Sequence, residues 1–290
     1  MHRLVFLLAS LAFLAGCEGG SQSWSVDNPT GAPLSLMIDD NDIDVPPRGH
    51  VEVSLSPGEH TMKGATTGAL TFIVYVRGKG GIINPTLGDY VIAQEAYVTD
   101  ASRLKNFAQL KDRITLDGVP FEGGFRQSNA LFIDKAWTFG IDEDFPDSVT
   151  GYDAGNGGNF FVKVFRASDF VAYYQMRYDA PDYVTTHRPA VPAPIEKRHP
   201  EPPPATLPVI GAAAYDDHTG PLRAIYTQYL QASEPAQQKT LQKAAFDAQM
   251  AYIHQIATAG SQETREVNER ANAFTQAFDN VLGASALIKR

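Results

Sequence analysis

Between about residues 24 and 180, apolar and polar residues alternate in short segments. Residues 51–55, Val-Glu-Val-Ser-Leu, change character at every position, which is the period of a half-buried strand. Residues 70–76 and 160–165 are apolar on both faces, as expected of central strands. Turn-forming residues, such as Ser-Pro-Gly at 56–58, separate these segments at regular intervals. Short strands at regular spacing predict an antiparallel, β-sandwich-like body.

After residue 218 the apolar period lengthens from two residues to between three and four. Val267, Phe274 and Phe278 belong to a seam that repeats every three or four residues, which is typical of helices that pack along their length. Gly260 followed by Ser261 indicates that one helix ends and another begins. We therefore predict two long helices in an antiparallel hairpin, with a shorter helix as a partial third member.

The helical seam has two interpretations, and the sequence leaves both open. The seam can be the internal core of the hairpin. It can also seat a partner helix or a second copy of the chain, because a helical unit of this size has a marginal core when it stands alone. Under the second interpretation, Val267, Phe274 and Phe278 are candidate partner-binding residues.

A proline-rich segment, residues 181–209, lies between the β-rich region and the helices. It contains nine prolines between Pro181 and Pro208. Proline resists helix formation and sheet pairing and favours extended chain. We predict a semi-rigid spacer, with an extended reach of roughly 80–90 Å at about 3.1 Å per residue. Binding of this segment to a partner that recognises proline motifs is the alternative.

The N-terminus has the order of a secretory signal peptide. Arg3 is followed by a run without charged residues at 4–14 and then by two small residues, Ala15 and Gly16. The run is too short for a transmembrane helix, which needs roughly 20 residues. We therefore expect residues 1–16 to be removed from the mature protein.

The four residues Leu14-Ala15-Gly16-Cys17 resemble the lipobox of bacterial lipoprotein precursors. The resemblance covers residues 1–17 and implies that Cys17 becomes the mature N-terminus, carrying a diacylglyceryl group and usually a further chain such as palmitate. Each buried methylene contributes about 0.8 kcal/mol, so two or three chains form a stable membrane anchor. Residue 18 is Glu rather than the Asp that tends to retain such proteins at the inner membrane, which favours the outer membrane, facing the periplasm.

The predicted fold class is therefore α+β and multidomain, with a β-sandwich-like body, a proline-rich linker and a C-terminal helical unit. Cys17 is the single cysteine in the 290 residues, so the fold has no internal disulfide. The predicted boundaries are 1–16 for the signal peptide, 17–23 for a lipidated tether, 24–99 for the first β domain, 100–180 for a second β-rich unit, 181–209 for the linker and 210–290 for the helical domain.

The charge of the chain narrows the classes of partner. The net charge is −9, and removal of residues 1–16, whose one charged side chain is Arg3, takes it to −10. Nucleic-acid binding requires clustered Lys and Arg, and anionic lipid surfaces attract basic segments. We expect no nucleic-acid partner, and attachment to the membrane through the lipid alone.

The most concentrated set of candidate metal ligands is acidic. Asp142, Asp144 and Asp153 lie within or beside a loop rich in Gly and Asn, and hard cations prefer several such oxygen ligands. A solvent-facing acidic loop explains the same residues, and we expect no bound metal or cofactor. The sequence contains no H-E-x-x-H and no G-x-S-x-G motif, so we expect a protein without catalytic activity.

Together these observations predict a lipid-anchored protein of the bacterial cell envelope with a role in binding or assembly, as an envelope or secretion-apparatus adaptor. A protein partner in the envelope is expected, whereas the oligomeric state stays open. Two alternatives remain. One is a lipoprotein that inhibits an envelope toxin, and the other is an envelope glycan hydrolase, whose paired carboxylates would meet only in the folded protein.

Overall fold

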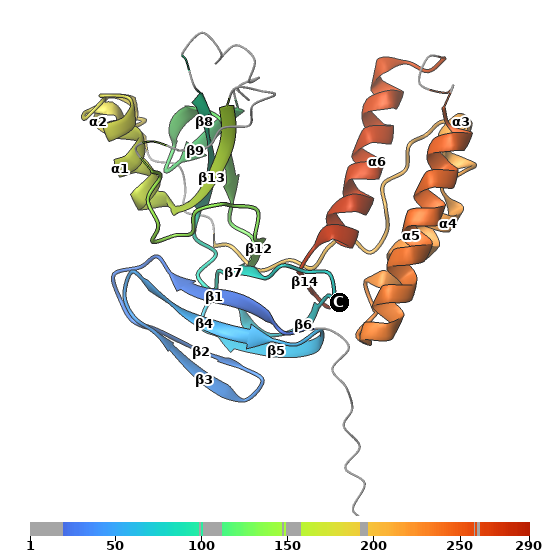
Figure 1. Ribbon diagram of the computed structural model, residues 1–290, viewed down its shortest axis with the longest axis horizontal. Coiled ribbons are helices and arrows are strands. Elements are labelled where there is room, and N and C mark those ends of the chain that lie inside the picture. Colours follow the sequence, from blue (N-terminus) through green and yellow to red (C-terminus); the bar gives the residue numbers. More distant parts are fainter. Residues whose placement is uncertain are drawn as a thin grey trace, which may run out of the picture.

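The structure is a computed structural model that describes residues 20–98, 100, 112–146, 148, 158–191, 197–257, 259 and 262–290. These residues form a mixed α+β fold with fourteen strands and six helices (Figure 1). Nearly all strand pairs are antiparallel, and the prediction of an α+β fold rich in antiparallel strands is confirmed. No helix in the described part of the chain is long and apolar enough to cross a membrane.

Two sheets, built mainly from the first part of the chain, share one hydrophobic cluster. Trp24 and Val26 face Phe72 and Val74 in this cluster, and all four side chains are buried. The four-stranded sheet has the order β12 (Phe132–Asp134), β7 (Gly81–Ile83), β1 (Gln22–Asn28) and β4 (Gly49–Leu55). The five-stranded sheet has the order β14 (Ala286–Ile288), β6 (Gly68–Val74), β5 (Gly58–Gly64), β2 (Leu34–Ile38) and β3 (Asn41–Val45).

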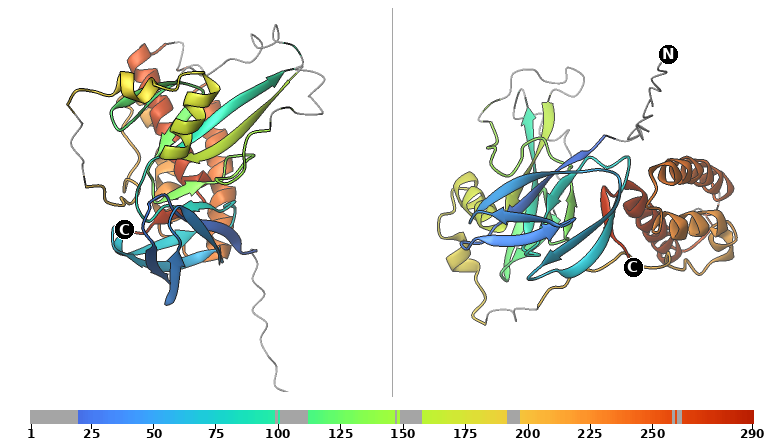
Figure 2. Two further views of the ribbon diagram at one scale, coloured as in Figure 1. Left: turned by 90° about the vertical axis from the view of Figure 1, so that its left-hand side faces the viewer. Right: turned by 90° about the horizontal axis from the view of Figure 1, so that it is seen from below.

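A second group of strands carries two helices on one flank (Figure 2). Phe121, Phe125 and Phe170 pack edge to face in its core. Its three-stranded sheet has the order β11 (Phe125–Ser128), β8 (Tyr90–Val98) and β13 (Gly158–Arg166). Beside the sheet lies the hairpin of β9 (Asp112–Leu116) and β10 (Val119–Gly123). The two helices are α1 (Ala167–Arg177) and α2 (Tyr183–His187). Because β8 pairs with both β11 and β13, the predicted boundary at residues 99 and 100 does not separate two independent sheets.

The C-terminal helices form the opposite flank (Figures 1 and 2). They are α3 (Ala213–Asp216), α4 (Gly220–Tyr229), α5 (Pro235–Gln255) and α6 (Arg265–Gly283). Pro221 lies in the first turn of α4, where a backbone N–H would have no acceptor within the helix, so its absence loses no hydrogen bond. The predicted break at Gly260 and Ser261 lies outside the described residues.

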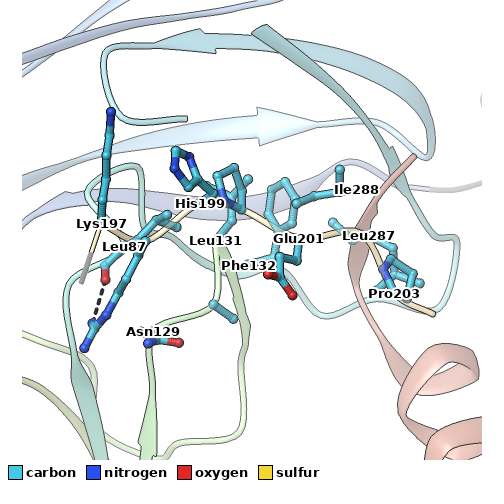
Figure 3. Close-up of a pocket in the computed structure, with 14 residues that line it drawn as sticks. Leu87, Asn129, Leu131, Phe132, Lys197, His199, Glu201, Pro203, Leu287 and Ile288 are labelled. Carbon is cyan, nitrogen blue, oxygen red and sulfur yellow. Dashed lines mark hydrogen bonds between the residues drawn. The ribbon is translucent and has the colours of Figure 1, made fainter. Parts of the chain in front are cut away.

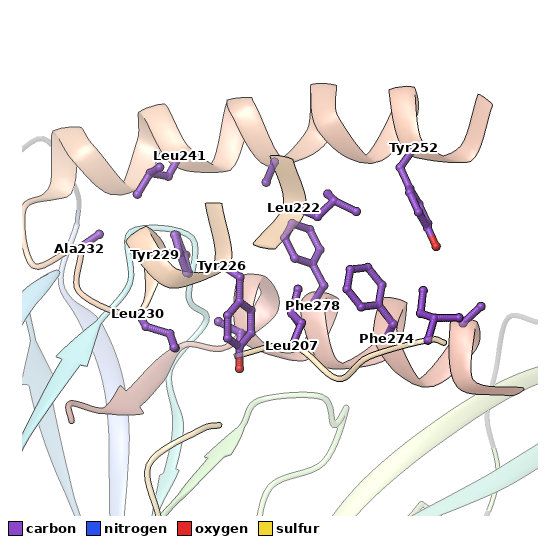
Figure 4. Packing of buried hydrophobic residues seen from close by; sticks show 14 of the residues in the cluster. Leu207, Leu222, Tyr226, Tyr229, Leu230, Ala232, Leu241, Tyr252, Phe274 and Phe278 are labelled. Carbon is purple, nitrogen blue, oxygen red and sulfur yellow. The ribbon is translucent and has the colours of Figure 1, made fainter. Parts of the chain in front are cut away.

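The predicted hairpin of the two long helices is wrong in one respect, because α4 lies between them. It packs against both α5 and α6. In Figure 4, Leu222, Tyr226 and Tyr229 of α4 lie between the two long helices. Beyond the end of α4, Tyr252 on α5 packs directly against Phe274 on α6, with ring centroids 5.9 Å apart. The physical reason is burial of apolar surface, since Leu222, Tyr226 and Tyr229 on α4 are fully buried in the cluster that the three helices share.

The described end of the proline-rich segment, residues 197–209, is docked on the rest of the protein, which corrects the prediction of an extended spacer. Arg223 donates hydrogen bonds to the carbonyls of Leu207 at 2.6 Å and Pro208 at 2.7 Å. Tyr226 donates to the Pro204 carbonyl at 2.8 Å. Proline lacks an N–H but keeps its carbonyl oxygen as an acceptor, so the segment cannot join a sheet and is held instead by side-chain donors.

The chain also returns to the β body after the helices. Strand β14 pairs with β6, with Leu287 opposite Ile73. Asp134, at the end of β12, accepts a hydrogen bond of 2.7 Å from the Ser285 N–H immediately before β14, and burial raises the pKa of the Asp134 carboxyl. The helical unit is therefore fixed at both of its ends, and it cannot be carried away from the body by the proline segment.

Candidate functional site

The predicted acidic cluster is only partly brought together. Asp142 and Asp144 lie on the loop between β12 and β13, whereas Asp153 and the lipidation candidate Cys17 lie outside the described residues. Asp142 accepts a hydrogen bond of 3.1 Å from Nη1 of Arg166 and lies 3.0 Å from Nδ1 of His50. No group of three or more potential ligands among the described residues is arranged to hold a metal ion.

A buried lysine holds the loop that carries Asp142 through hydrogen bonds to its backbone carbonyls. Nζ of Lys163 donates to the carbonyls of Gly140 at 2.9 Å and Ile141 at 3.0 Å, and also to the Glu143 carbonyl. Burial lowers the pKa of this ammonium group, while the neighbouring carboxylates oppose that shift. The acidic residues of this loop therefore surround a structural cation of the protein itself.

A cleft of about 290 Å³ opens between this loop and the exposed face of β1 and β4. Three carboxylates line it, and each already accepts hydrogen bonds within the protein. Glu52 accepts from the hydroxyls of Ser23 and Ser25, and Glu143 accepts from the Gly140 N–H at 2.6 Å. Asp142, the third carboxylate, accepts from Arg166, so donors of the protein itself already engage all three groups.

The apolar seam of the last helix is internal. Phe274 and Phe278 are 0% and 1% exposed, and Val267 packs at the margin of the same cluster. The guanidinium of Arg223 lies over the ring of Phe274, 4.9 Å from its centroid, a distance at which a cation and an aromatic ring attract. The part of the seam that contains Phe274 and Phe278 is therefore covered by the protein's own helices.

A different apolar stripe lies on the outward face of α5. Phe246, Met250 and Ile253 are 62%, 45% and 48% exposed. Steps of four and three residues place them on one side of a helix, while Leu241 and Tyr252 on the other side are buried. Several large apolar side chains exposed together are informative, whereas one alone is ordinary. We call these three residues the α5 stripe.

The spacing of the α5 stripe is visible in the sequence, but it competes with the buried seam on the same helix. Both sets recur every three or four residues, because α5 carries apolar side chains on two sides. Periodicity identifies each set as one helix face. It does not show which face is covered, and that depends on where α4 packs.

A larger cavity of about 550 Å³ lies beneath the proline-rich segment (Figure 3). Leu87 and Lys197 lie toward one end of it, and Leu287 and Pro203 toward the other. His199, Leu131 and Phe132 lie between them. Its floor comes from residues near β12 and from β14, so it exists only because the C-terminal strand returns to the body.

Comparisons with protein-family models, with curated proteins and with solved structures found no match to this chain.

Proposed function

We propose that this is a lipid-anchored protein of the bacterial cell envelope with a non-catalytic role in binding or assembly, and that the α5 stripe is its docking surface. The proposal includes a β-sandwich-like arrangement of the two sheets around Trp24 as the rigid body. The observation that carries it is the exposure of Phe246, Met250 and Ile253 on one helix face. An assembly protein needs such a face, whereas a hydrolase needs an open pair of carboxylates.

The helix that carries the stripe is fixed to the β body by a buried glutamine. The side chain of Gln238 donates to the carbonyls of Val74 at 3.2 Å and Ala232 at 2.8 Å, and it accepts from the Val76 N–H at 2.9 Å. A polar side chain buried with its hydrogen bonds satisfied orients the elements that it joins. The stripe is therefore presented in a preorganised orientation.

Strand β1, the first element that the structure describes, is linked to the same helices through Tyr75. The side chain of Gln22, in β1, donates to the Tyr75 carbonyl at 2.5 Å, and the Tyr75 hydroxyl donates to the Tyr229 carbonyl at 3.1 Å. The rings of Tyr75 and Tyr229 stack with centroids 4.4 Å apart. A short tether from Cys17 to β1 would hold the helical unit close to the membrane surface rather than at the end of a long arm.

The partner proposed for the stripe is an amphipathic helix with acidic residues beside its apolar face. A stripe one helix-face wide matches the i, i+4, i+7 pattern of helical recognition segments. The exposed cation Lys243 lies one turn before Phe246 on the same side of α5. A carboxylate on the partner would face this ammonium group, which favours one orientation of the two helices.

The anchor is tested by Cys17→Ser, which should move the protein from the membrane fraction to the soluble fraction. The substitution removes the only attachment point for two or three acyl chains. Because this is the single cysteine, the change breaks no disulfide. Fractionation and labelling with a clickable palmitate analogue measure the effect. Unchanged membrane retention together with unchanged labelling would contradict the proposed anchor.

The docking surface is tested by the double substitution Phe246→Asp and Met250→Asp. A photo-crosslinking amino acid at position 250 in intact cells first identifies the partner. The double variant should then bind the purified partner about a hundredfold more weakly, because two apolar anchors become charged, while thermal stability changes little at these exposed positions.

The matched control for the double variant is Ala251→Asp. Ala251 is exposed on the same helix but lies away from the stripe, so this variant should bind the partner normally. Equal loss of binding in both variants would contradict the assignment of the stripe. Identification of an envelope toxin as the crosslinked partner would favour the inhibitor alternative, which uses the same surface.

A further inference from the structure

We propose that the cavity beneath the proline-rich segment binds a single-chain amphiphile, which is an apolar chain with an anionic head group. This site is separate from the α5 stripe, and it concerns a small ligand rather than a protein partner.

The floor of the cavity suits an apolar chain. Leu131 is buried, and Phe132, Leu287 and Ile288 are half-buried, so that each presents part of an apolar side chain to the cavity. These residues lie one after another along its length in Figure 3. A cavity of about 550 Å³ falls within the roughly 300–1,000 Å³ of small-molecule sites, which are mainly apolar with a few polar groups.

The roof of the cavity is held in place, so the site is preformed. Arg198 donates to the Leu87 carbonyl at 2.9 Å and pairs with Asp89 at 2.9 Å. At the other end, Arg290 donates to the Pro203 carbonyl at 2.8 Å. The rigidity of the prolines between these two contacts limits the conformations of the roof. A preformed site loses little conformational entropy when its ligand binds.

The polar residues of the cavity indicate the sign of the head group. Lys197, beside Leu87, and His199, farther along the cavity, are exposed, and neither forms a hydrogen bond or ion pair with a residue that the structure describes. The guanidinium of Arg198 is already paired with Asp89. Glu201 also lines the cavity, on the opposite side of the segment from His199 in the view of Figure 3. An anionic head beside Lys197 and His199 gives the complementary charge.

The experiment uses the mature chain with Cys17→Ser and titrates three probes below their micelle concentrations, by calorimetry and by two-dimensional NMR. Decanoate should bind saturably, with shifts at His199 and Ile288. Decyltrimethylammonium, with the same chain and the opposite charge, should bind about tenfold more weakly or worse. Hexanoate, which lacks four methylenes, should bind about a hundredfold more weakly.

Two variants separate this site from the α5 stripe. The double substitution Lys197→Glu and His199→Glu should weaken decanoate binding about tenfold or more, and Lys243→Glu, on α5, should leave it unchanged. Equal affinity for decanoate and decyltrimethylammonium would overturn the proposal, as would undiminished binding to the double variant. NMR shifts confined to Phe246 and Met250 would also overturn it, by showing that decanoate prefers the exposed stripe, and they would leave the proposed function intact.

Discussion

Arg166→Met is expected to lower the free energy of unfolding by about 3–5 kcal/mol, because it leaves a buried carboxylate without a cation. Asp27 is fully buried in β1, and its carboxylate accepts hydrogen bonds from Nε of Arg166 at 3.0 Å and from Nη2 at 2.5 Å. The Tyr90 hydroxyl donates to the same carboxylate at 2.5 Å. The pKa of Tyr90 is raised, first by burial and then by the charge of Asp27, so the hydroxyl remains a proton donor.

The position of this pair explains why the loss should be large. Arg166 ends β13 and Asp27 belongs to β1, so the ion pair joins two sheets. Arg166 also holds Asp142 at 3.1 Å, and through it the loop above β1. Removal of the guanidinium therefore leaves the buried Asp27 carboxylate without its cationic partner. It also frees the surface loop that carries Asp142.

Urea unfolding of three variants measures the effect. Asp27→Asn combined with Arg166→Met should recover much of the loss, because no charge is then left buried. Arg177→Met breaks the partly exposed pair with Glu95 and should cost about 1 kcal/mol or less. A loss for Arg166→Met as small as that for Arg177→Met would show that the buried pair does not hold the sheets together.

Phe274→Ala is expected to destabilise the protein by about 3–5 kcal/mol, whereas Phe246→Ala should change stability by about 0.5 kcal/mol or less. Phe274 projects from α6 and is fully buried against α4 and α5, so its removal leaves a cavity near Leu222 and Tyr252. Phe246 projects from the outward face of α5, and the shorter side chain leaves no cavity. The two substitutions delete the same atoms, and only burial differs.

The affinity of the two variants for the partner should show the opposite order from their stability. Phe246→Ala should weaken binding of the crosslinked partner about tenfold or more, while Phe274→Ala should retain binding at temperatures where it is folded. Equilibrium unfolding followed by circular dichroism gives the first comparison, and calorimetry with the purified partner gives the second. Similar losses of stability in the two variants would contradict the placement of the two faces.

Local patterns in the sequence predicted much of the secondary structure. The alternation at residues 51–55 corresponds to β4, and the apolar run at 160–165 lies within β13. Pro221 in the first turn of α4 and Pro235 at the start of α5 mark helix starts as their local chemistry requires. Thr219 precedes α4 but makes no capping hydrogen bond, because its hydroxyl donates to the Asp216 carbonyl instead. These signals depend on neighbouring residues alone, and that is why they can be recognised without a fold.

The candidate surfaces could not be predicted in the same way. Strand β14 has three residues, and its pairing with β6 depends on a contact across some two hundred positions. The proline-rich segment is docked because Arg223, Tyr226 and Arg290 reach its carbonyls. Nothing within the segment itself indicates those donors.

The sequence by itself determined the elements, the acidic character of the chain and an N-terminus that resembles a lipoprotein precursor. The tertiary structure decided which of two apolar faces on α5 is buried, where the proline-rich segment lies, and that Asp27 pairs with Arg166. The physical reason is that periodicity records how a segment divides into faces. Whether a face is covered depends on elements such as α4 and β14, which meet it only when the chain folds.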